Sequence, residues 1–83
     1  MSLQSELETL FTPTTIRQSR KLEPEKVDAL AVREAAGALL RLRGQPHAQV
    51  DLVRKMTPPT AAALCRWLGD PSFWGLVLGV TRH

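Results

Sequence analysis

The chain has 83 residues, of which 43% are hydrophobic and 23% are charged, and its net charge at pH 7 is +3. This composition excludes a disordered chain and predicts one small packed domain, which buries only about 60% of the surface of its unfolded chain. The apolar run from Phe73 to Val80 is far shorter than the roughly 20 residues of a transmembrane helix. Glu6 and Glu8 do not fit a secretory signal, and Cys65 is the one cysteine, so we expect a cytoplasmic protein.

The first predicted element is an amphipathic helix over residues 1–11. Its apolar residues recur at i, i+4, i+7 and i+8, which places them on one stripe of a helix. An isolated helix of about ten residues is unstable in water, so this one needs a surface to lie on, in its own chain or in another. The stripe consists of Leu3, Leu7, Leu10 and Phe11.

Residues 12–22 show no apolar period. They begin with Thr12 and Pro13, which stop the preceding helix, and they gather three basic side chains. We interpret this segment as a linker or an ordered loop and the remainder, residues 23–83, as a helical core domain. The three basic residues are Arg17, Arg20 and Lys21.

The longest predicted helix spans residues 24–42 and ends before Gly44. Pro24 suits a first turn, and the carboxylates of Glu25 and Asp28 favour the positive end of the helix dipole. We expect one apolar arc of this helix to face the core, and its alanines to let another helix approach closely. That arc contains Val27, Ala31, Ala35, Ala38, Leu39 and Leu42.

Three shorter helices are predicted over residues 47–56, 58–68 and 73–80, each near a proline-marked turn. Residues 39–53 also alternate apolar and polar side chains around a Gly-Pro turn, which is typical of a hairpin, and residues 75–81 would suit a buried strand. The sequence favours an all-α fold, a small bundle of four to five short helices. The alternative is an α+β fold with the hairpin and a C-terminal strand.

No group of residues predicts catalysis or a cofactor. His47, His83 and Cys65 lack the clustering of four ligands that a structural zinc site needs. Cys65 lies among alanines and leucines, where burial disfavours the reactive thiolate. We therefore predict a protein that is not an enzyme and holds no metal or cofactor.

Protein association is the predicted function, as an interaction module, an adaptor or a small subunit of a larger assembly. The partner is another protein or a second copy of the chain. Aromatic side chains are enriched at interface hot spots, although in so small a protein the same residues also suit the core. If the C-terminal segment packs on the long helix, the N-terminal stripe is the element left to meet a partner. The candidate protein-binding residues are Leu3, Leu7, Leu10, Phe11, Trp67, Phe73 and Trp74.

The alternative function is nucleic-acid binding by a small basic protein. The two helices over residues 47–56 and 58–68 outline a helix-turn-helix, but the second of them offers only Arg66 to base edges. The sequence contains no tyrosine for base stacking. Phosphate contacts would come from a basic loop and from the end of the long helix, through Arg17, Arg20, Lys21, Arg41 and Arg43.

Overall fold

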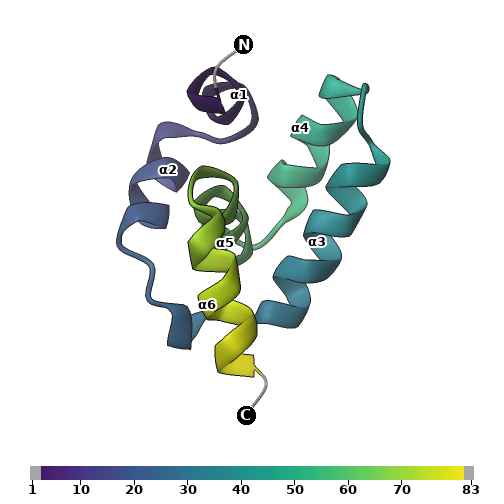
Figure 1. The fold of residues 1–83 in the computed structure, drawn as a ribbon. Helices are drawn as coiled ribbons and strands as arrows, with labels where there is room; N and C mark the ends of the chain where they lie inside the picture. Colours follow the sequence, from purple (N-terminus) through teal and green to yellow (C-terminus); the bar gives the residue numbers. More distant parts are fainter. Residues whose placement is uncertain (1–2, 82–83) are drawn as a thin grey trace.

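The computed structural model describes residues 3–81, with side chains described for residues 5–77. Within this range all regular secondary structure is helical, and there is no strand (Figure 1). The all-α prediction is confirmed, and the hairpin and the C-terminal strand were wrong. The elements are α1 (Leu3–Leu10), α2 (Pro13–Arg20), the 3-10 helix η1 (Pro24–Lys26), α3 (Ala29–Arg41), α4 (Pro46–Lys55), α5 (Pro58–Gly69) and α6 (Pro71–Thr81).

Helix α5 is the centre of the fold. Helices α1, α2, α3 and α6 all pack against it, and Figure 1 shows it between α2 and α3. Five consecutive residues, from Ala61 to Cys65, are buried, and Leu64 is 0% exposed. Small side chains bring neighbouring helix axes close together, so the alanines of α5 allow it to be covered on several sides.

Two hydrophobic clusters hold the helices together. The main core consists of buried residues from four parts of the chain: Phe11, Ala36, Leu39, Val53, Leu64 and Cys65. A second cluster beside α6 consists of Ala29, Phe73 and Val77. Trp67 packs against the main core and Trp74 against the second, and their ring centroids lie 5.1 Å apart, so this aromatic pair joins the two clusters.

Helix α2 occupies most of the segment that we expected to be a linker or a loop. The Thr12 side chain caps it by accepting a hydrogen bond from the Thr15 N–H at 3.2 Å, and Pro13 is its first residue. The helix packs along α5, with Ile16 against the main core. Its buried residue is Ser19, whose hydroxyl donates to the Ile16 carbonyl oxygen at 2.6 Å. The segment was misread because a polar residue fills the buried position, which removes the apolar period.

The long helix is shorter than predicted, and a different face of it is buried. A 3-10 turn covers residues 24–26, and α3 begins after Asp28, whose carboxylate accepts a hydrogen bond from the Ala31 N–H at 3.2 Å. This orientation buries Val32, which lies outside the predicted arc, together with Leu39, whereas the smaller Ala31, Ala35 and Ala38 stay half-buried. The buried residues of α3 are Ala29, Val32, Ala36 and Leu39.

The first and last helices, α1 and α6, pack on the body of the protein. Phe73 and Val77 of α6 are buried, and this helix contacts η1, α3 and α5. At the other end, α1 packs against α5 and α4, and Leu7 and Leu10 lie against the main core. The N-terminal stripe therefore finds partial cover within the chain, with Phe11 buried and Leu7 and Leu10 half-buried.

Two glycine substitutions are expected to change stability in opposite directions. In α3, a Cβ added at Gly37 meets nothing within 4 Å, so Gly37→Ala raises the free energy of unfolding by about 0.5–1 kcal/mol. Gly44 has a φ of 85°, a left-handed conformation, so Gly44→Ala lowers it by roughly 1–2 kcal/mol. Urea unfolding followed by circular dichroism measures both changes. Shifts of the two variants in the same direction would contradict either the open space at Gly37 or the left-handed conformation of Gly44.

Candidate protein-binding groove

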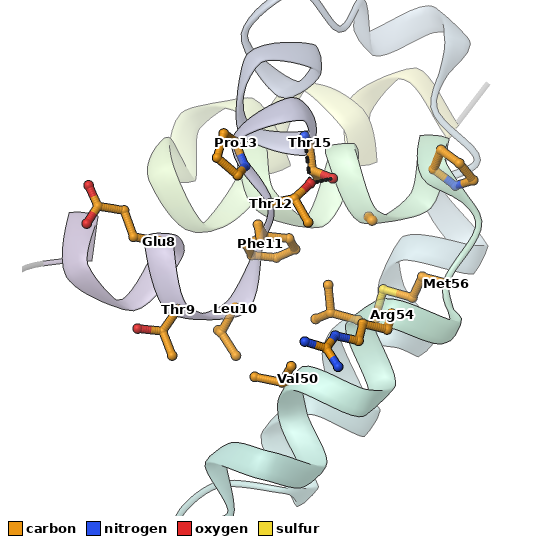
Figure 2. A pocket seen from close by; sticks show the side chains of 13 residues that line it. Glu8, Thr9, Leu10, Phe11, Thr12, Pro13, Thr15, Val50, Arg54 and Met56 are labelled. Atoms are coloured by element: carbon orange, nitrogen blue, oxygen red, sulfur yellow. Dashed lines mark hydrogen bonds between the residues drawn. The ribbon is translucent and has the colours of Figure 1, made fainter.

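An open groove of about 450 Å³ lies where α1 ends and α2 begins (Figure 2). Across the groove stand the second half of α4 and the first turn of α5. The volume falls in the range of about 300–1,000 Å³ that is typical of binding pockets. Four helix ends, rather than one continuous segment, therefore build this hollow.

The base of the groove is made of core residues. Phe11, Val53 and Ala61 line it and are 3%, 7% and 5% exposed, so well-packed side chains support the base from below. Leu10 from α1 and Val50 from α4 line its opposite sides and are only half-buried. In Figure 2 these two side chains approach each other across the opening. The groove thus presents apolar contact area that remains open to solvent.

The turn between α1 and α2 fixes one wall of the groove. The Phe11 N–H donates a hydrogen bond to the Leu7 carbonyl oxygen at 2.8 Å, which carries the α1 hydrogen bonds up to the turn. Thr12 then caps α2, and its hydroxyl also lies 3.0 Å from the hydroxyl of Thr15. This hydrogen bond uses one of the two hydroxyl protons, so one O–H donor of the pair is left for a ligand or water.

Two charged residues line the groove, and they point in different directions. Figure 2 shows the Arg54 guanidinium reaching from α4 into the space towards Leu10, whereas the Glu8 carboxylate points away from the hollow. Neither residue forms an ion pair within the described part of the chain. Two helices begin at the groove and two end there, so their dipoles largely offset one another. Of the two, Arg54 is the residue that directs its charge into the groove.

The predicted protein-binding residues fall into two separate places. Leu10 and Phe11 line the groove, although Phe11 is buried and supports its base. Leu7 packs against the main core, and the side chain of Leu3 lies outside the described residues. The remaining three, Trp67, Phe73 and Trp74, lie on α5 and α6, away from the lining of the groove.

The aromatic residues of α5 and α6 mainly stabilise the fold. Phe73 is 4% exposed, and the Arg66 guanidinium carbon lies 5.5 Å from the centre of its ring, a cation–π distance. Arg66 also pairs with Asp70 at 3.7 Å. Hydrogen bonds from Ser72 hold the pKa of the Asp70 carboxyl below its usual value. Trp67 and Trp74 are half-buried, so Phe73 is the one aromatic residue of the three that the fold removes from solvent almost completely.

The predicted nucleic-acid-binding residues are not gathered on one face. Arg17, Arg20 and Lys21 belong to α2 and its end, whereas Arg41 and Arg43 lie at the end of α3. Figure 1 shows these two regions on opposite sides of α5. Helix α5, the second helix of the supposed helix-turn-helix, is covered by its neighbours and presents no face to a DNA groove.

Cys65 is buried, and burial raises the pKa of its thiol, while the Ser19 hydroxyl and the Arg20 charge act in the opposite direction. His47 is exposed at the start of α4. Over the residues that the structure describes, no group of three His, Cys, Asp or Glu side chains is placed to hold a metal ion. No helix in that same range is long and apolar enough to cross a bilayer.

The raised pKa of Cys65 predicts a pH dependence of stability. The folded state binds the thiol proton more tightly than the unfolded state, so this stabilisation is complete at neutral pH and is lost as pH rises from the unfolded pKa through the folded one. Urea unfolding under reducing conditions, between about pH 7 and pH 10, compares the protein with Cys65→Ala. We expect the parent to lose its advantage over the variant as pH rises. If the difference in free energy of unfolding between the parent and Cys65→Ala does not change with pH, the raised pKa of the Cys65 thiol is contradicted.

Comparisons of this chain with protein-family models, with curated proteins and with solved structures find no match.

Proposed function

We propose that the protein is a non-enzymatic interaction module that binds an apolar segment of another protein in the groove between α1 and α4. One observation supports this proposal above others: half-buried apolar side chains line an open hollow whose base is fixed by the core. Burial of the exposed parts of Leu10 and Val50 by a ligand would release water from apolar surface, which favours binding. An amphipathic helix laid in a groove is a common way in which proteins recognise one another.

The large apolar side chains that are most exposed in the described part of the chain, Leu30, Leu40 and Leu76, do not line the groove. Leu30 and Leu40 are 65% and 62% exposed, but they lie at opposite ends of α3, about 15 Å apart along the helix axis. Scattered exposed leucines are ordinary on soluble proteins, whereas a concave group of apolar residues marks a binding site. The groove is therefore the better candidate, and a separate partner protein is the occupant that we propose rather than a second copy.

The buried free thiol of Cys65 fits a reducing compartment, so we propose a cytoplasmic location.

Selection from a displayed library of random peptides of about twelve residues tests the proposal. Val50→Gln places a polar side chain in the groove, and Leu40→Gln makes a matched change on an exposed helical surface outside it. We expect selected peptides to bind the parent and Leu40→Gln equally and to bind Val50→Gln at least about tenfold more weakly. Circular dichroism confirms that both variants are folded.

Two results would contradict the proposed function. One is a selection that yields no binder to the folded protein. The other is a set of binders whose affinity is the same for the parent and for Val50→Gln, since these would occupy another surface. Sedimentation velocity over a range of protein concentrations addresses self-association: a monomer agrees with a separate partner, whereas a dimer that Val50→Gln dissociates would assign the groove to a second copy.

A further inference from the structure

We propose that the segment bound in the groove is acidic and that one of its carboxylates pairs with Arg54. This inference rests on the proposed function, and it adds the chemistry of the partner. The groove has an apolar base and a cation at its opening. The complementary ligand is a short amphipathic segment with an apolar anchor and an aspartate or glutamate beside it.

Arg54 is placed where it can form an ion pair with a carboxylate of the bound segment. It is exposed, and its guanidinium points into the space between α4 and α1 (Figure 2). Val50 lies one helical turn before it, at i−4, so the apolar stem of the arginine and the valine share one side of α4. The positive charge of Arg54 can pair there with a ligand carboxylate through a charge-assisted hydrogen bond.

The surroundings of Arg54 leave this charge unmet within the described part of the chain. It forms no ion pair there, and Glu8, the acidic residue that lines the same groove, points outward. The threonine hydroxyls at the rim hydrogen-bond each other. An acidic ligand would therefore meet an unpaired cation, whereas a basic ligand would meet like charge, so Arg54 selects between the two. The net charge of +3 adds a weaker attraction for acidic segments.

The same geometry predicts a spacing in the ligand. Val50 and Arg54 are four residues apart on one helix, so their side chains project about one turn from each other. A helical ligand that contacts both needs its apolar anchor and its carboxylate at a similar separation, three or four residues apart. We expect peptides selected on this protein to carry that spacing.

Three variants on α4 test the inference with the peptides from the selection. Arg54→Glu reverses the charge at the groove, Arg54→Lys keeps it, and Lys55→Glu makes the same change in net charge at the next residue, which does not line the groove. Fluorescence anisotropy measures the dissociation constant of each peptide. We expect at least about a tenfold loss of affinity for Arg54→Glu and changes within about threefold for the other two variants.

The outcomes separate this inference from the function on which it rests. Peptides that depend on Val50 but carry no excess of aspartate or glutamate would overturn the acidic partner and leave the groove intact. Equal losses for Arg54→Glu and Lys55→Glu would likewise overturn it, because general electrostatic attraction would then explain the preference. Binders that ignore Val50 would overturn the proposed function itself. Acidic peptides that lose affinity in Val50→Gln and Arg54→Glu alone would support both.

Discussion

Leu64→Ala is expected to lower the free energy of unfolding by about 2–5 kcal/mol. Leu64 is 0% exposed at the centre of α5, the helix that four others contact, so its truncation leaves a cavity that the surrounding helices cannot readily close. A domain of this size has a total stability of roughly 4–12 kcal/mol. The variant therefore loses a large fraction of its stability. Urea unfolding followed by circular dichroism at 222 nm, the helical band, measures the loss.

Leu40→Ala is the matched control for that experiment. It makes the same chemical change inside a helix, but at a side chain that is 62% exposed. We expect its stability to change by no more than about 0.5 kcal/mol. Similar losses in the two variants would contradict the central position of α5.

Phe73→Ala is expected to lower the free energy of unfolding by about 3–5 kcal/mol. Phe73 is 4% exposed, and it and Val77 are the two buried residues through which α6 contacts the second cluster. The Arg66 guanidinium also loses the ring over which it lies. Thermal and urea unfolding measure the change. Amide hydrogen exchange should show the greatest loss of protection in α6, since its docking on η1 and α3 depends on this side chain.

This variant also distinguishes a core role from an interface role for Phe73. The residue type alone does not decide between them, because aromatic side chains suit both. An interface residue would change association with little effect on the stability of the monomer. Leu76→Ala on the same helix is the control, because Leu76 is 59% exposed. A stable Phe73→Ala protein, or equal effects of the two substitutions, would refute the core assignment.

Most of the helices could be predicted from the sequence because prolines mark where they begin. Pro24 precedes α3, and Pro46, Pro58 and Pro71 each stand at the first turn of a helix. Helix α2 also begins with a proline, Pro13, but its inner face carries Ser19 in place of an apolar residue. The buried face of α3 was misjudged because apolar spacing alone does not weigh Val32, which is 1% exposed, against the smaller alanines of the predicted arc.

The groove was only partly predictable. Leu10 and Phe11 belong to the apolar stripe that the sequence marks as a binding candidate, and both line the groove. Val50 and Arg54 were missed, because their meeting with α1 depends on how distant segments pack and not on any local pattern. The signal that the sequence does carry is their i, i+4 spacing on one helix. This spacing indicates a shared binding surface only when α1 is known to lie opposite α4.

The central claim is that a partner segment binds between α1 and α4, and titration of the ¹⁵N-labelled protein with a selected peptide tests it most directly. Amide chemical shifts report which backbone segments sense the peptide. The predicted result is a set of changes concentrated at residues 8–15 and 50–61, which contain the lining of the groove, with little change around Trp67 and Trp74. Changes concentrated at the α5–α6 corner instead, with the groove residues unmoved, would contradict it.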